Sequence, residues 1–231
     1  MKERMASMVG ESGTTMEFLG RKIMDGKLEG ISIELVIADH PNTPPIDRAE
    51  ILRIPVKIVE RNKFKNRNSY GEALLQLFER YRISVVSLNG TLNIIPGNVL
   101  NGFNGRIFNQ HPGPKKETEK TWGIMPYAIM LEFIHLTGRN EGTDVIIHRV
   151  TNQVDEGPTV AISHVPIFEE DTAETLQERG KEVERQLQLE FWENFVKGEV
   201  QEVHDTVYMR PGEEHLLRAA RLKARKDYPT G

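Results

Sequence analysis

The stretch that decides the fold is ISIELVIAD, residues 31–39, an apolar and β-branched run of strand length. Gly30 precedes this run and the turn-rich HPNTPP follows it. Similar runs occur at IPVKIVE (54–60), ISVVSL (83–88) and RIFNQ (106–110). Between two of them, SYGEALLQLFERY carries apolar residues at helical spacing, namely Leu74, Leu75, Leu77 and Phe78. Strands that alternate with helices in this way predict a parallel sheet covered by helices on both faces.

The second half of the chain follows a different pattern. YAIMLEFIHL (127–136) predicts a helix, and TDVIIHRV (143–150) and PTVAISHVPIF (158–168) predict two strands joined by a short polar loop. A long helix is expected over 172–196, with Asp171 or Thr172 as its cap. The predicted fold class is therefore α/β: a Rossmann-like mixed sheet, parallel in its N-terminal half, with antiparallel strands added in the C-terminal half and helices on both faces.

Composition limits what the 231-residue chain can be. A net charge of −4 and a pI near 6.0 argue against a protein whose whole surface attracts nucleic acid. The lack of cysteine excludes disulfides, thiolate zinc sites and cysteine nucleophiles. No apolar run is long enough to cross a membrane, and MKERMASMVGESG lacks the apolar stretch of a secretory signal. We therefore expect no membrane partner and a cytoplasmic location.

Domain boundaries are not marked by any repeat, low-complexity segment or Pro/Gly/Ser-rich linker in the sequence. We therefore expect one domain over 1–209, followed by a helical tail over 210–231. The tail is basic between Arg210 and Lys226, but LLRAARLKAR also has apolar residues at helical spacing. This pattern indicates the solvated face of a closing helix, and we expect no nucleic-acid partner.

The segment from Asn109 to Gly113, NQHPG, places an amide and an imidazole at the carboxyl end of a predicted strand. Side chains two apart on a strand point the same way, so Asn109 and His111 could face one cleft. Together they would offer a neutral and a titratable hydrogen-bond donor to one developing oxyanion. The alternative interpretation is a buried polar residue followed by a turn histidine.

A second segment runs from His148 to the turn Asp155-Glu156-Gly157-Pro158. A β-turn favours Asp and Gly for backbone reasons, and this alone would explain most of the segment. A functional interpretation requires one carboxylate to orient the imidazole of His111 and to stabilise its protonated form.

Four features together resemble the phosphoribosylglycinamide formyltransferases, the glycinamide ribonucleotide formyltransferases of purine biosynthesis. These features are the NxHP strand end at 109–112, the spacing from His148 to Asp155, the VDEGP turn, and PIFEEDTAETLQERGKEVE at 166–184. The resemblance extends from about Gly10 to about Val203. It implies a folate-dependent enzyme that uses 10-formyltetrahydrofolate as co-substrate, acts on a small molecule and needs no metal.

The resemblance also implies roles for individual residues. Asn109, His111 and Asp155 match the catalytic Asn, His and Asp of the family. The acceptor substrate, including its phosphate, would contact Gly13, Thr14, Thr15, Arg67, Lys181 and Glu184. The folate would contact Leu88, Gly90, Leu92, Asn93, Ile94, His148 and Val154. In the implied reaction the substrate amine attacks the formyl carbon directly, while Asn109 and His111 stabilise the oxyanion and Asp155 holds the imidazole and helps to relay a proton.

Three segments depart from the family pattern. Thr91-Leu92-Asn93 replaces a Phe-Met-Arg type of sequence, PGPKKETEKTWGIMPY replaces SLLP after the histidine, and RMASMVG replaces an aliphatic first strand. An intrahelical ion pair is also the simpler interpretation of Lys181 and Glu184, which are three residues apart.

Several alternatives therefore stay open. A formyltransferase of the same fold could act on another amine, such as a nucleotide-linked amino sugar, or on methionyl-tRNA, although the tRNA enzyme normally carries a second domain. A non-catalytic protein that binds folate or a nucleotide is the alternative from another class. A metal hydrolase built on His111, His148 and Asp155 would lack a short-spaced ligand pair. A homodimer is compatible with the sequence.

Overall fold

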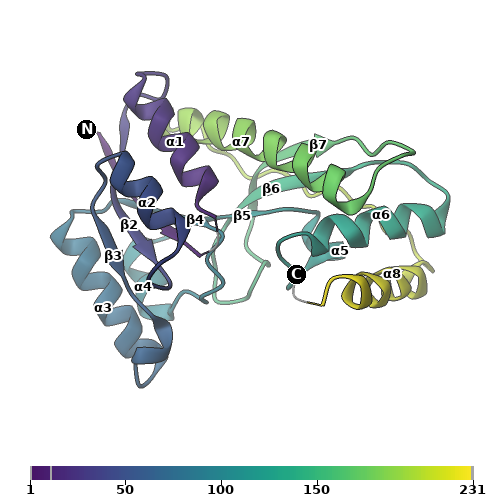
Figure 1. The fold of residues 1–231 in the computed structure, drawn as a ribbon, viewed down its shortest axis with the longest axis horizontal. Coiled ribbons are helices and arrows are strands. Elements are labelled where there is room, and N and C mark those ends of the chain that lie inside the picture. The colour runs from purple at the N-terminus through teal and green to yellow at the C-terminus, as the bar shows by residue number, and fades with distance from the viewer. Residues whose placement is uncertain (1, 11, 230–231) are drawn as a thin grey trace. The chain divides into compact units, whose positions relative to one another are not determined.

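The computed structural model describes residues 2–10 and 12–229 (Figure 1). The chain divides into two compact units. The first unit comprises Met1–Gln110, Arg149–Gly157 and Gln188–Val200, and the second comprises His111–His148, Pro158–Leu187 and Gln201–Gly231. Each unit therefore draws on segments that are far apart in the sequence.

The first unit is built on a parallel sheet. Its strands are β1 (Glu3–Val9), β2 (Ile31–Ala38), β3 (Val56–Ile58), β4 (Val85–Asn89) and β5 (Ile107–His111), of which the last residue belongs to the second unit. They lie in the order β3-β2-β1-β4-β5, and each pairing among them is parallel. The unusual sequence of β1 suits a central strand, because the buried hydroxyl of Ser7 accepts a hydrogen bond from Asn89 Nδ2 at 2.8 Å.

Helices cover both faces of this parallel sheet. They are α1 (Thr14–Met24), α2 (Pro44–Ile51), α3 (Arg67–Arg80), α4 (Gly97–Phe103) and the C-terminal part of α7 (Ala173–Lys197), and a short 3-10 helix, η1 (Arg61–Lys63), precedes α3. Met8 and Ile107 belong to a buried cluster with Leu74 of α3. Phe108, which follows Ile107 and so points to the opposite face, packs against Phe191 of α7 with ring centroids 4.9 Å apart.

The second unit contains the antiparallel part of the fold. β6 (Thr143–Arg149) pairs antiparallel with β7 (Thr159–Val165), and the strand order of the seven-stranded sheet is β3-β2-β1-β4-β5-β6-β7. The unit also contains α5 (Lys115–Thr118), α6 (Met125–Thr137), the N-terminal part of α7 and α8 (Glu214–Asp227). A buried cluster joins α6 and α8, and its members are Met125, Ala128, Ile129, Met130, Phe133, Ala173, Tyr208, Leu217, Ala220 and Ala224.

The structure confirms the predicted fold class, with a parallel first half, an antiparallel addition and covering helices. Two local predictions differ from it. The turn expected at HPNTPP is shorter than predicted, because α2 begins at Pro44 and proline suits the first turn of a helix. The strand expected over 54–60 forms only over Val56–Ile58, since β3 is an edge strand. In the described ranges 2–10 and 12–229, no helix has both the length and the apolar character needed to cross a membrane.

Candidate active site

The carboxyl end of β5 carries the first two predicted catalytic residues. Phe108 faces α7, and so does Gln110, whose Oε1 accepts a hydrogen bond from Gln188 Nε2 at 2.8 Å. Asn109 and His111 alternate with these residues and therefore point to the opposite side of the strand. Asn109 is half-buried, whereas His111 is only 3% exposed. β5 extends to His111, so strand geometry directs the amide and the imidazole to the same side, and their joint action stays a prediction.

Within the second unit, the imidazole of His111 has a defined partner. Its Nε2 lies 2.9 Å from the hydroxyl oxygen of Thr118, which is also buried. The same hydroxyl donates a hydrogen bond to the carbonyl oxygen of Pro114 at 2.8 Å. A Cβ on Gly113 would lie 2.6 Å from the Thr118 hydroxyl oxygen, so this approach requires glycine. The loop after the histidine therefore folds back onto the ring.

Asp155 lies in a turn of the first unit and has a left-handed backbone conformation, with φ of 60°. Aspartate and asparagine tolerate this conformation better than most residues. The turn is tightly closed, because a Cβ on Gly157 would lie 1.8 Å from the carbonyl oxygen of Arg149. Its first residue is tied to β5, since the Val150 N–H donates to the Ile107 carbonyl oxygen at 2.8 Å. The turn that carries Asp155 therefore starts beside the strand that carries Asn109.

The predicted catalytic residues are divided between the two units. Asn109 and Asp155 belong to the first unit, whereas His111 belongs to the second. The buried His148, on β6, also belongs to the second unit. The convergence of the amide, imidazole and carboxylate on one carbonyl group stays a prediction.

The predicted phosphate site lies at the start of α1. Gly13 has φ of 68°, and a Cβ there would lie 2.8 Å from Cβ of Pro45 in α2, so both conformation and space require glycine. The N-cap residue of α1 is Gly13, which has no side chain that could cap the helix, and Thr14 and Thr15 are half-buried in the first turn. Uncapped N–H groups at a helix start favour an anion. A cation not predicted from the sequence, Arg48, lies beside this turn and donates to the Ser12 carbonyl oxygen at 2.9 Å.

The other predicted contacts of the acceptor substrate lie on two helices. Arg67 is the exposed first residue of α3 in the first unit, while Lys181 and Glu184 lie on α7 in the second unit. Lys181 is exposed, but the carboxylate of Glu184 is buried and accepts a hydrogen bond from the Tyr127 hydroxyl at 2.8 Å. Burial, and then the charge of Glu184, raises the pKa of Tyr127 well above its ordinary value. The hydrogen bond from Tyr127 thus fixes the position of the Glu184 carboxylate. That Glu184 and Arg67 bind the same substrate molecule stays a prediction.

The predicted folate segment follows β4 in the first unit. Leu88 is buried at the end of the strand, and Gly90 has φ of 86°. The large apolar side chains Leu92, Ile94 and Val154 are 57%, 43% and 40% exposed. Exposed apolar side chains near the carboxyl ends of parallel strands are what a bound aromatic ring would cover.

The part of the folate segment that departs from the family pattern is held by a carboxyl group. Thr91 donates to Asp39 Oδ2 at 2.8 Å, and the Asn93 N–H lies 3.3 Å from the Thr91 hydroxyl oxygen. Asp39 is 6% exposed. Burial raises its pKa, although hydrogen bonds from Thr91 and Asn93 act in the opposite direction. The threonine and asparagine therefore shape this loop through Asp39.

Besides Arg48, the polar partners Asp39, Tyr127 and Thr118 were not predicted from the sequence. Asp39 directly follows β2, so its place at a carboxyl strand end could have identified it. Tyr127 lies 57 residues from Glu184, and no local pattern links the two. Thr118 lies in a loop without periodicity, so only the folded structure reveals its contact with His111. In residues 2–10 and 12–229, no group of three or more His, Asp or Glu side chains could hold a metal ion.

The mixed sheet, with an amide and an imidazole at the end of β5, defines a class of α/β proteins. Sequence comparison identifies the family within this class. The chain belongs to the formyl transferase family, whose model matches residues 3–191. The match covers the parallel sheet, the antiparallel strands and most of α7. The segment that contains α8 lies beyond it.

Particular relatives carry more specific names. The phosphoribosylglycinamide formyltransferase of Bacillus subtilis (strain 168) is 22% identical over 179 residues, which cover 77% of this chain and 86% of that protein. The human trifunctional purine biosynthetic protein adenosine-3 is 28% identical over 189 residues, which cover 80% of this chain and 18% of that protein. The chain thus spans about a fifth of the length of the trifunctional relatives that it matches.

Solved structures show the same similarity. The phosphoribosylglycinamide formyltransferase of Bacillus halodurans has a TM-score of 0.73 and 27% identity, with 84% of this chain and 95% of that chain covered. Glycinamide ribonucleotide transformylase 1 of Symbiobacterium toebii has a TM-score of 0.75 and 23% identity, with 88% and 95% covered, and shares the fold.

Proposed function

We propose that this chain transfers the formyl group of 10-formyltetrahydrofolate to the amine of glycinamide ribonucleotide, a step of purine biosynthesis. The observation that carries the proposal is the end of β5, where Asn109 and His111 point to the same side of the strand. The hydrogen bond from the Val150 N–H to the Ile107 carbonyl oxygen supports the proposal, because the turn that carries Asp155 therefore starts beside β5. The names of the relatives from Bacillus subtilis and Bacillus halodurans support the choice of acceptor.

In the proposed reaction, the neutral amine of the acceptor attacks the formyl carbon and the formyl oxygen becomes an oxyanion. The amide N–H of Asn109 and the imidazole of His111 donate hydrogen bonds to this oxyanion. The carboxylate of Asp155 orients the imidazole and receives the proton that the amine loses, directly or through water. The bond between the formyl carbon and N10 of the folate then breaks, and N10 takes up a proton. The chemistry requires no covalent intermediate with the protein.

Binding of the two substrates is assigned to the two groups of residues described above. The uncapped start of α1 at Gly13, Thr14 and Thr15 would bind the phosphate, and Glu184 would accept hydrogen bonds from the acceptor substrate. The exposed apolar side chains Leu92 and Ile94 would pack on the folate ring system.

The experiment is a formyl-transfer assay with 10-formyltetrahydrofolate and glycinamide ribonucleotide. We expect turnover by the wild type and a loss of roughly 10²–10⁴ in kcat for Asp155→Asn, which is the usual contribution of a positioned acid or base. Asparagine also tolerates the left-handed backbone of residue 155, so the variant should keep the turn and remove only the charge. Glu156→Gln, an exposed neighbouring acid in the same turn, is the matched control and should retain wild-type turnover.

Three outcomes would contradict the proposal. Equal activity of Asp155→Asn and the wild type would remove Asp155 from the mechanism. Turnover only with a nucleotide-linked amino sugar would select the other acceptor. Folate binding without transfer to any amine would favour a binding protein, and the same assay run without acceptor would detect simple hydrolysis to formate.

A further inference from the structure

The loop that follows His111 is held by the end of the chain. We call residues 112–121 the post-histidine loop and residues 203–228 the C-terminal strap. The family match ends at residue 191, so the strap lies outside it. The loop and the strap both belong to the second unit, together with His111.

Contacts between strap and loop are polar and directed at α5. The N–H of Met209 donates to Oε1 of the fully buried Glu117 at 3.0 Å. Arg221 on α8 donates from Nε to the Glu117 carbonyl oxygen and from Nη2 to the Lys116 carbonyl oxygen, both at 3.0 Å. Lys115 Nζ lies 3.3 Å from a carboxylate oxygen of Asp205. The strap therefore binds three consecutive residues of α5.

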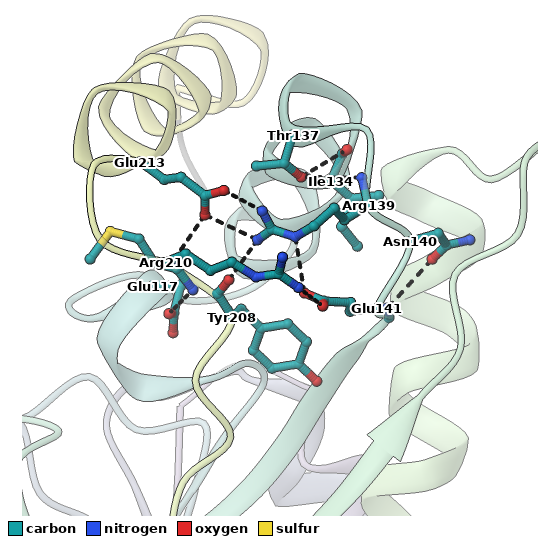
Figure 2. Close-up of polar contacts among 11 residues, drawn as sticks. Glu117, Ile134, Thr137, Arg139, Asn140, Glu141, Tyr208, Arg210 and Glu213 are labelled. Carbon is teal, nitrogen blue, oxygen red and sulfur yellow. Dashed lines mark hydrogen bonds and ion pairs between the residues drawn. The ribbon is translucent and has the colours of Figure 1, made fainter.

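The strap is itself anchored after α6, as Figure 2 shows. The guanidinium of Arg139 pairs with both carboxylate oxygens of Glu213 and donates to the Tyr208 carbonyl oxygen at 3.0 Å. Hydrogen bonds from Arg139 lower the pKa of Glu213 to about 2. The backbone N–H of Arg210 also donates to Glu213 Oε2, at 2.8 Å. These contacts fix the backbone on either side of Met209.

The next residue of α5, Thr118, contacts the imidazole. A hydroxyl group has one hydrogen, and that of Thr118 is used in the bond to the Pro114 carbonyl oxygen. At the 2.9 Å contact with His111, the hydroxyl must therefore accept, and Nε2 of His111 must carry a hydrogen. In a neutral ring with hydrogen on Nε2, the nitrogen that gains or loses a proton is Nδ1.

We propose that Thr118 and Arg221 are positioning residues for His111. Thr118 holds the ring with hydrogen on Nε2, so that Nδ1 is the nitrogen that exchanges protons in the reaction. Arg221 and the strap hold α5, and with it Thr118, in place. The consequence for catalysis rests on the proposed function, whereas the state of the ring does not.

The ring state can be measured without substrate, by NMR of the histidine ring nitrogens in 15N-labelled protein, with His111 assigned through its loss in His111→Gln. In the wild type we expect Nε2 to stay protonated while Nδ1 titrates. Thr118→Val removes the acceptor and should shift the tautomer ratio by about fivefold, the usual effect of one net hydrogen bond. Thr118→Ser keeps the hydroxyl and should restore the wild-type spectrum and pH profile. Unchanged His111 signals in a folded Thr118→Val protein would overturn the assignment.

The role of the strap is tested with two variants of α8. Arg221→Ala removes the bonds to α5, whereas Lys223→Ala removes an ion pair with Glu132 of α6. We expect faster amide hydrogen exchange in 115–118 and a mixture of His111 tautomers only in Arg221→Ala. If the two variants behave alike, the C-terminal strap stabilises the fold but does not position His111. If the wild type shows no formyl transfer while His111 responds as expected, the proposed function fails and the positioning of the ring stands.

Discussion

At the scale of single residues, the structure holds its key side chains by several hydrogen bonds each. Asp171, just before α7, is the clearest case. Its carboxylate accepts from the Phe168 N–H at 2.8 Å and from the Thr175 hydroxyl at 2.8 Å, and it pairs with Arg179 through both oxygens at 2.6 and 2.7 Å. Hydrogen bonds from Arg179 are the largest cause that lowers the pKa of Asp171 to about 2, from an ordinary value of 3.8. The folded state therefore prefers the ionised carboxylate.

The substitution Asp171→Asn removes this preference for the ionised carboxylate. A lowered folded-state pKa stabilises the protein above the ordinary value of 3.8, and this stabilisation is lost as the pH falls towards about 2. We expect the variant to lose about 1 kcal/mol of unfolding free energy at neutral pH, since Arg179 is partly exposed and solvent screens its charge. The difference from the wild type should shrink as the pH falls below about 4. Urea unfolding across this pH range measures it. Glu170→Gln, at an exposed neighbouring position, is the control, and a difference independent of pH would contradict the argument.

At the scale of elements, α7 depends on a glycine for space. Gly180 lies in the middle of the helix, and a Cβ at this position would lie 2.3 Å from the Tyr127 hydroxyl oxygen. The same hydroxyl donates to Glu184, one turn further along α7. The close approach of α6 and α7 at Gly180 therefore sets the position of the carboxylate proposed to bind the acceptor.

Gly180→Ala should reverse the usual effect of this substitution. In an exposed helix interior, alanine is more stable than glycine by about 0.5–1 kcal/mol. Here the methyl group would displace Tyr127, and we expect a loss of about 1–3 kcal/mol, as in other overpacked interiors. Thermal unfolding measures the loss, and Glu178→Ala, at an exposed position on the same helix, should be nearly neutral. An increase in the melting temperature of Gly180→Ala would show that Tyr127 can move without cost.

The elements also show how far the sequence alone could go. Apolar runs of strand length predicted β2 and β5, and helical periodicity predicted α3, each within one or two residues. Periodicity did not predict α4 or α5, which are too short to show a period. The alternation of side chains on a strand predicts that Asn109 and His111 share one side, and the structure confirms that β5 extends over both residues. The contact of Thr118 with His111 depends on how a loop folds, and no pattern along the chain encodes that.

At the scale of the whole molecule, β5, β6 and α7 run through both units. β5 contributes Ile107–Gln110 to the first unit and His111 to the second, and α7 is divided after Leu187. In the first unit, the aromatic cluster of Phe108, Phe191, Trp192 and Phe195 is built on the end of α7. A helix propagates its hydrogen bonds cooperatively, so loss of one half of α7 weakens the other half. We therefore expect the two units to unfold together.

The chain offers a direct test, because its two tryptophans are Trp122 and the fully buried Trp192. In a Trp122→Phe background, fluorescence follows Trp192 in the first unit alone. Leu217→Ala removes a buried side chain between α6 and α8 in the second unit and should cost about 2–3 kcal/mol. If the units unfold together, this variant lowers the urea midpoint measured at Trp192, whereas Leu222→Ala, 62% exposed on the same helix, leaves it unchanged. The alternative result is that Leu217→Ala leaves the urea midpoint at Trp192 unchanged while circular dichroism shows a separate early transition. This result would mean that the two units unfold independently and that α7 frays between them.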